Sequence, residues 1–213
     1  MTAVVDNDVL FKGACYAELD RLVPGASRDG VVGVLGSARF VVPKRVGKTS
    51  LNGDRTKVLE RFFEFLSRAE TLEPADDEQK MAADLELAAQ QQALNLDTGE
   101  SQLCAILVQR ALDWLVTGDK RGIAAIEALL NIEPRLKPIC GKVKCLEQLF
   151  AEAVARHGHA MLRVAVCGEP HIDTALAICF SCKRRIVESA EVREGLLSYV
   201  NDLRKRAGRV LAP

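Results

Sequence analysis

Two apolar segments that each end at an acidic residue constrain the fold most strongly. Ala3-Val4-Val5 is followed directly by Asp6, and Trp114-Leu115-Val116-Thr117 is followed by Gly118-Asp119. After each acid, apolar residues recur at helical spacing, which indicates a buried strand followed by a helix. Strands that alternate with helices favour a parallel sheet with helices on both faces. The sequence therefore predicts an α/β protein, a three-layer α/β/α sandwich with a central parallel sheet.

The remaining elements follow from the same periodicity. Pro24-Gly25 and Asp29-Gly30 break the chain. Runs of apolar and β-branched residues predict further strands at 31–35, 40–42, 136–140 and 162–166. A basic loop is expected over 43–53. Helical spacing predicts a helix capped by Asp54 and others at 78–93, 103–111, 123–130, 143–155, 173–187 and 191–207. We assign residues 1–150 to one α/β domain and 151–213 to a mainly helical extension packed on it.

Composition limits the size of the core, the kind of contact with nucleic acid and the relation to membranes. With 213 residues, 48% of them apolar and 27% charged, the chain is long enough for one sizeable core. Its net charge is zero, so any contact with nucleic acid must come from local basic patches. Acidic residues interrupt the N-terminal segment, and no apolar run approaches the roughly 18 residues of a membrane span. We expect a cytoplasmic protein that does not contact a membrane.

Seven cysteines are present, and four of them (Cys15, Cys104, Cys145 and Cys179) lie among apolar neighbours. A reduced thiol packs there as a small hydrophobe, so we expect free core thiols. Cys179 and Cys182 have the spacing of half a zinc site, but the spacing is not repeated nearby. A structural zinc site is therefore not favoured.

Three acids are predicted to meet at one edge of the sheet. Asp6 and Asp119 follow strands, and ligands of open parallel sheets bind beyond the carboxyl ends of the strands. Glu100 lies in the first turn of its helix, with Asp97 or Thr98 as the cap, and can face the same edge. Three converging carboxylates repel one another unless a cation joins them, and hard oxygen ligands suit Mg²⁺ or Mn²⁺. The predicted site is therefore a metal site.

Three segments, in this order and spacing, resemble the acidic motifs of PIN-domain nucleases. They are residues 4–10 (Val-Val-Asp-Asn-Asp-Val-Leu), 96–101 (Leu-Asp-Thr-Gly-Glu-Ser) and 115–121 (Leu-Val-Thr-Gly-Asp-Lys-Arg). The resemblance spans roughly residues 1–150. It implies a Mg²⁺- or Mn²⁺-dependent endonuclease acting on single-stranded or structured RNA. Asp6, Glu100 and Asp119 would be catalytic, and these three with Asp8 would bind the metal.

The resemblance has two further consequences. Many such nucleases are toxins of toxin–antitoxin pairs, so it implies an inhibitory antitoxin protein as a partner, and a homodimer as an assembly. The family usually has another acid between the first two motifs. That stretch offers several glutamates without a distinctive context, and the choice among them stays open: Glu60, Glu64, Glu70, Glu78 and Glu86.

Two basic pairs are candidates for contact with RNA phosphates. Lys44 and Arg45 belong to a basic run, and Lys120 and Arg121 directly follow Asp119. A run of charges is more often a solvated face, so both readings stay open. Val46-Gly47-Lys48-Thr49 imitates the end of a phosphate-binding loop but lacks its first glycine, which excludes a nucleotide-binding P-loop.

Simpler and competing interpretations remain beside the nuclease. Asp6 and Glu100 are also ordinary helix-start acids, and Asp119 is also an ordinary turn residue. A haloacid-dehalogenase-type phosphatase would use the spacing of Asp6 and Asp8, but residues 123 and 124 are Ile and Ala where it needs a second acid after Asp119. A non-catalytic interaction module with a PIN-like shape is the other alternative, because fold does not dictate activity.

Overall fold

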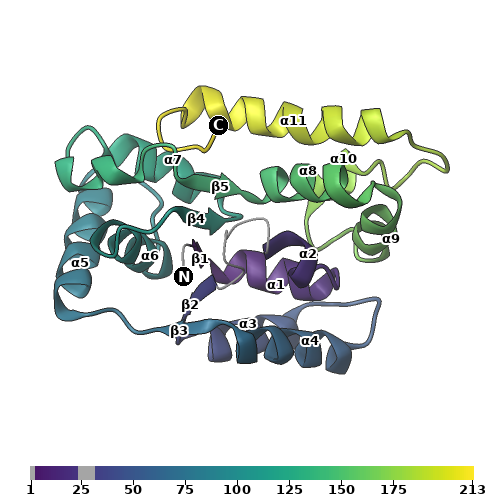
Figure 1. Cartoon of the computed structure of the whole chain (residues 1–213), viewed down its shortest axis with the longest axis horizontal. Helices are drawn as coiled ribbons and strands as arrows, with labels where there is room; N and C mark the ends of the chain where they lie inside the picture. The colour runs from purple at the N-terminus through teal and green to yellow at the C-terminus, as the bar shows by residue number, and fades with distance from the viewer. Residues whose placement is uncertain (1–2, 24–31) are drawn as a thin grey trace.

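The computed structural model describes residues 3–23 and 32–213 (Figure 1). Five parallel strands form one sheet: β1 (Ala3–Val5), β2 (Val32–Leu35), β3 (Glu70–Leu72), β4 (Trp114–Thr117) and β5 (Val143–Cys145). Their order is β3-β2-β1-β4-β5. The predicted parallel α/β sheet is confirmed. The expected breaks at 24–25 and 29–30 lie outside the described residues.

The helices follow the strands along the chain, and most match the sequence prediction to within a few residues. The longer ones in the first part are α1 (Asn7–Cys15), α3 (Ala38–Lys48), α4 (Arg55–Arg68), α5 (Asp76–Gln91), α6 (Thr98–Gln109) and α7 (Lys120–Leu129). The short α2 (Leu19–Leu22) and the 3-10 helix η2 (Pro134–Ile139) complete that part. After β5 come α8 (Leu146–His157), α9 (Ala160–Gly168), α10 (Thr174–Cys179) and α11 (Ser189–Arg206).

Two hydrophobic cores lie on opposite faces of the sheet, because successive strand residues point to opposite sides. Ala3 and Val5 of β1 belong to the core formed with α1–α4 and α8–α10. Val4 belongs to the other core, which contains apolar residues of α5, α6, α7 and η2. Helices thus cover both faces, and the three-layer arrangement is present.

The C-terminal segment is part of this architecture. Val192 and Leu196 of α11 join the first core, whereas Val200 and Leu203 join the second, so α11 crosses from one core to the other. Beyond α11 the chain returns to the edge of the sheet, where Val143 N–H donates to the Val210 carbonyl. The boundary that we place at residue 150 falls inside α8, and it stays an interpretation.

Three predicted strands are wrong, and each has a local reason. Residues 40–42 lie in α3, since Ala38, Val42 and Val46 recur every four residues and all are buried; the predicted basic loop over 43–53 is therefore mostly helix. Residues 136–139 lie in η2, which Cys140 caps, and Pro138 cannot donate to a ladder. Residues 162–166 lie in α9, whose buried residues Leu162 and Val166 are one helical turn apart.

Two strands were misplaced or missed. The helix predicted from residue 143 begins instead at Leu146, because 143–145 is the edge strand β5. The strand β3 has no counterpart in the prediction, since Glu70 and Thr71 are exposed and give it no apolar pattern.

The cysteines are mostly as expected. Cys15, Cys104, Cys145 and Cys179 are free and buried, which confirms the prediction of core thiols. Cys167 and Cys182 form a disulfide, which the sequence analysis did not foresee. No helix in the described ranges is long and apolar enough to cross a bilayer.

Candidate active site

The strand order places two of the predicted acids at the point where the sheet topology reverses. β1 lies between β2 and β4. The chain runs outward from β1 to β2 and β3, and then crosses to the other side of β1, where it forms β4 and β5. Ligands of open α/β sheets bind at such a switch point, beyond the carboxyl ends of the strands. A cleft of about 870 Å³ opens there. Its walls include all four predicted metal ligands: Asp6, Asp8, Glu100 and Asp119.

Asp6 is fixed at the end of β1 by hydrogen bonds on its backbone and side chain. Its backbone N–H donates to the Val116 carbonyl on β4 at 2.9 Å. One carboxylate oxygen accepts from the Asp8 N–H at 3.3 Å, as an N-cap of α1, and from the Thr117 hydroxyl at 3.3 Å. Burial, and secondarily the charge of Asp8, raise the pKa of Asp6 to about 6.

Asp119 is the N-cap of α7 and is linked to Asp6 through one side chain. Its carboxylate accepts from the backbone N–H groups of Arg121 at 2.8 Å and Gly122 at 3.3 Å. Its own N–H donates to the Thr117 hydroxyl, which in turn donates to Asp6. Burial opposes ionisation, but the Arg121 and Gly122 hydrogen bonds outweigh it and lower the pKa of Asp119. Thr117 thus ties the two acids together, a role that the sequence analysis missed.

Glu100 is held at the start of α6 by a reciprocal capping box with Asp97. The Glu100 N–H donates to Asp97 at 2.8 Å, and the Asp97 N–H donates to Glu100 Oε2 at 3.2 Å. Asp97, rather than Thr98, is therefore the cap. The other oxygen, Oε1, is buried and has no hydrogen-bond partner among the described residues. Burial is the largest cause that raises the pKa of Glu100 to about 8, and the charges of Asp97, Asp119 and Asp6 add to it.

Two glycines of the third motif make room for acids of the cleft. A Cβ at Gly122 would lie 1.9 Å from Glu100 Oε1, so any side chain there would displace this carboxylate from its position. A Cβ at Gly118 would lie 2.1 Å from an oxygen of Asp8. Thr117, Gly118 and Gly122 therefore position the acids of the cleft, whereas the sequence analysis named only Asp119, Lys120 and Arg121 of this segment as functional.

The carboxylate of Asp8 forms ion pairs with two basic side chains. Lys12 Nζ lies 2.7 Å from one Asp8 oxygen, and Arg45 Nη1 lies 2.8 Å from the other. Lys12 also contacts Asp173, at 2.7 Å. Asp173 caps α10, so a residue of the C-terminal part is tied through Lys12 to the wall of the cleft. These ion pairs make Asp8 a structural anchor in this conformation.

The four basic residues predicted to contact RNA differ in their placement. Arg45 and Arg121 are among the residues that line the cleft. Lys120 instead contacts the buried carboxylate of Glu147 at 2.5 Å and lies over the Tyr199 ring. Lys44 is exposed on α3 beside Arg45, outside the cleft lining.

The additional acid that was left open is not found among the five glutamates considered. None of them belongs to the lining of the cleft. Glu78 pairs with Arg110 at 2.7 Å, and Glu86 accepts from Ser101 at 2.7 Å. The acid that joins the other four in the cleft lining is Asp97.

The donor set fits a hard divalent cation in its chemistry. Asp6, Glu100 and Asp119 offer carboxylate oxygens, the ligands that Mg²⁺ and Mn²⁺ prefer. The unpartnered Oε1 of Glu100 and the raised pKa values of Asp6 and Glu100 show a cluster that a cation would stabilise. Within residues 3–23 and 32–213, no three Asp, Glu, His or Cys side chains already surround one point as metal ligands would. The capping bonds of Asp6 and Asp119 account for this, because they direct oxygens toward the helix starts.

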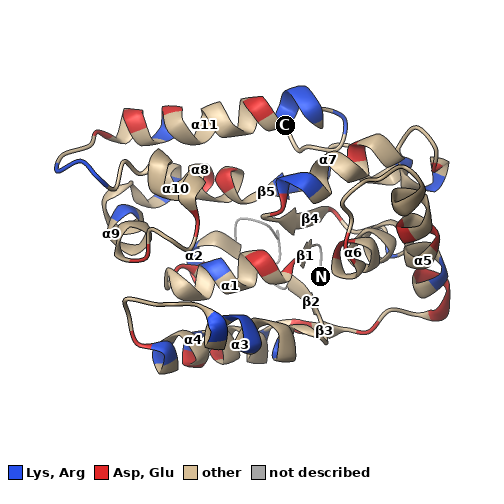
Figure 2. Ribbon diagram, turned by 180° about the vertical axis from the view of Figure 1, so that it is seen from behind, with Lys and Arg blue, Asp and Glu red and all other residues tan. Residues whose placement is uncertain are grey.

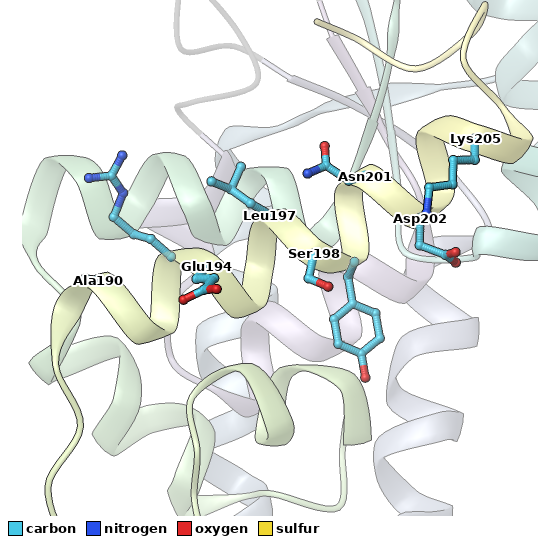
Figure 3. Close-up of a pocket in the computed structure, with 9 residues that line it drawn as sticks. Ala190, Glu194, Leu197, Ser198, Asn201, Asp202 and Lys205 are labelled. Carbon is cyan, nitrogen blue, oxygen red and sulfur yellow. The ribbon is translucent and has the colours of Figure 1, made fainter.

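A second hollow, of about 860 Å³, lies along the outer face of α11. Figure 3 shows that its labelled side chains, from Ala190 to Lys205, all come from this one helix. None of its charged lining residues is buried. The hollow therefore lacks the converging, desolvated groups that characterise the cleft at β1 and β4.

Comparison of the chain with family models, curated proteins and solved structures gives no match.

Proposed function

We propose that this protein is a divalent-metal-dependent endonuclease that hydrolyses phosphodiester bonds in RNA. The observation that carries the proposal is the buried carboxylate of Glu100, whose Oε1 has no partner in the described part of the chain and whose pKa is raised to about 8 beside Asp6 and Asp119. Helix capping accounts for the position of one carboxylate oxygen of each acid. It does not account for the meeting of three acids, each from a different helix start, in one cleft at a topological switch point.

The residues of the cleft have separate roles in the proposed reaction. Asp6, Glu100 and Asp119 would hold Mg²⁺ or Mn²⁺. Such an ion, when bound, neutralises charge on the phosphodiester and lowers the pKa of the attacking water. Thr117 fixes the relative positions of Asp6 and Asp119 through its hydroxyl. Arg121 lies on the cleft wall with an exposed side chain, which pairs with Asp119 at 3.3 Å. A cation bound by Asp119 would replace this exposed pair and would leave the Arg121 guanidinium for the substrate phosphate.

Asp8 is left out of the proposed ligand set, because Lys12 and Arg45 both occupy its carboxylate. The same ion pairs weaken the phosphatase alternative, which needs this residue to exchange a proton with the substrate. From the resemblance alone, the proposal extends to the toxin of a toxin–antitoxin pair, with an antitoxin protein as inhibitor and a homodimer as assembly.

The proposal is tested by incubating the purified protein with end-labelled RNA in Mn²⁺, in Mg²⁺ and in a chelator. We expect cleavage with either metal and none with the chelator. Asp119→Asn, which keeps the size of the side chain and removes its charge, should lower the rate by on the order of a hundredfold or more. Asp202→Asn, an acid of similar chemistry on the surface of α11, serves as the matched control and should cleave normally.

Two results would contradict the proposal. Cleavage that persists in the chelator, or that Asp119→Asn leaves unchanged, would show that a contaminant or another site is responsible. No cleavage with either metal, together with no binding of Mn²⁺, would favour the non-catalytic interaction module.

A further inference from the structure

The exposed face of α3 combines unpaired cations with a large exposed aromatic residue. Arg39, Lys44 and Lys48 are exposed, and in the described parts of the chain none of them is ion-paired. Phe40 is 71% exposed. The helix has no acidic residue, and Figure 2 shows basic residues on it, next to α4, which carries both basic and acidic residues. Arg39, Lys44 and Lys48 therefore have no carboxylate on their own helix and no ion pair with the described residues around it.

Exposed cations elsewhere on the surface fall into two groups. Five arginines each have a carboxylate partner within 3.0 Å: Arg68, Arg135, Arg184, Arg206 and Arg209. Within the described residues, Lys57, Lys183 and Lys205 are exposed and have no ion pair, like the three unpaired cations of α3. What distinguishes α3 is that its unpaired cations accompany the exposed Phe40 and lie on the helix that lines the cleft. An unpaired basic face fits an anionic occupant.

The periodicity of α3 places this face beside the cleft. At about 3.6 residues per turn, residues four apart lie on the same side of a helix. Ala38, Val42 and Val46 are buried, whereas Ser37, Val41 and Arg45 line the cleft. Phe40, Lys44 and Lys48 form the next stripe, on the solvent side of the cleft-lining one. Arg39 lies on the far side of the exposed face.

We propose that the stripe of Phe40, Lys44 and Lys48 is a binding surface for single-stranded RNA that leads into the cleft. Phe40 would stack on one unpaired base, and the two lysines would contact the phosphates that follow it. The inference rests on the proposed nuclease function, and it adds a substrate subsite that lies outside the acidic motifs.

The combination of groups supports this occupant. Aromatic side chains that stack on bases, together with basic residues along the backbone, are the usual means of binding single strands without reading their sequence. In a duplex the faces of the bases are covered by their neighbours, so Phe40 would find no exposed ring to stack on. An acidic peptide would pair with the lysines but would leave Phe40 without an aromatic partner.

Binding is measured by fluorescence anisotropy with a labelled 12-nucleotide oligouridylate in a chelator, so that no cleavage occurs. We expect Phe40→Ala to weaken binding about tenfold, the effect of losing one base–aromatic stack. Phe40→Leu, which keeps an apolar side chain, should also weaken it. Neither change should alter the binding of an RNA duplex of the same length.

The lysines are tested by the salt dependence of the same binding. Lys44→Gln combined with Lys48→Gln should lower the slope of log Kd against log salt by about 1.4, at roughly 0.7 per phosphate contact with a single strand. Arg39→Gln is the matched control, because it removes a cation from the same helix on the side away from the stripe. It should change the binding constant by less than about twofold.

Unchanged oligouridylate binding in both Phe40 variants would overturn the inference, and so would an equal loss in Arg39→Gln and in the lysine variant. The outcomes separate this inference from the nuclease proposal. Weaker binding in Phe40→Ala without any metal-dependent cleavage would support the surface and remove the proposed enzymatic activity. Normal metal-dependent cleavage together with unaltered binding in Phe40→Ala would support the enzymatic activity and remove the proposed binding surface.

Discussion

Replacing Glu100 by glutamine should stabilise the metal-free protein at neutral and alkaline pH. The pKa of Glu100 is raised to about 8, mainly by burial, whereas an unfolded glutamate has a pKa of about 4.3. Between these values the folded state binds a proton that the unfolded state has lost, so stability falls as pH rises. At about 1.36 kcal/mol per pKa unit, the cost at pH 7 is roughly 3 kcal/mol. Glutamine mimics the protonated carboxyl and removes this cost.

The assay is urea unfolding of both proteins in a chelator at several pH values from 5 to 8. The difference in free energy of unfolding between Glu100→Gln and wild type should be small at pH 5 and grow steadily toward pH 8. Asp6 titrates in the same window, since its pKa is about 6, but it is present in both proteins and its effect largely cancels.

Glu78→Gln is the matched control with the opposite sign. Glu78 is similarly buried and accepts from the backbone N–H of Ala75 at its helix start, but the Arg110 hydrogen bond lowers its pKa. Its stabilising contribution is present above the pKa of an unfolded glutamate and is lost as pH falls, so this variant should be less stable than wild type at neutral pH. A Glu100→Gln difference that does not change between pH 5 and 8 would refute the argument that Glu100 is held protonated.

The remaining predictions concern the supports of the cleft. Gly122→Ala should lower the affinity for Mn²⁺ at least tenfold in calorimetry, because its Cβ would lie 1.9 Å from Glu100 Oε1, whereas Gly47→Ala, with no atom near its Cβ, should not. Lys12→Met should destabilise the protein by about 3 kcal/mol in urea unfolding, since it leaves the buried carboxylate of Asp173 without its cation, whereas Asp8 keeps Arg45; a loss below about 1 kcal/mol would show that the pairs are dispensable. Cys167→Ser should lower the unfolding free energy by about 3 kcal/mol under non-reducing conditions, as expected for a loop closed over 15 residues, and an unaltered midpoint would contradict it.

The sequence predicted those parts of the fold and site that depend on neighbouring residues. The acid after β1 and the acid after β4 were found because a buried strand, a cap and a helix follow one another within a few positions. The helix start at Glu100 was found for the same reason, with the cap left open between Asp97 and Thr98, and the structure shows that Asp97 is the cap. Local patterns of this kind carry the information that places the acids at one edge of the sheet.

Other features depend on contacts that no local pattern encodes. One of the two partners of Lys12 is Asp173, which lies in the C-terminal part of the sequence. The role of Thr117 requires knowledge that β1 and β4 are neighbours. Apolar runs such as residues 40–42 and 162–166 were assigned to strands because a short run fits either period, and the packing against the core decided for the helix.

A calorimetric titration with Mn²⁺ at pH 7, repeated in buffers of different ionisation enthalpy, tests the central claim most directly. Because Glu100 has a pKa of about 8, a metal ion bound by its carboxylate must displace the proton. We predict saturable binding to the wild-type protein with release of about one proton per ion, and loss of both the binding and the proton release in Glu100→Gln. Binding that is equally strong in Glu100→Gln, or that releases no proton from the wild-type protein, would contradict the assignment of this carboxylate to the metal.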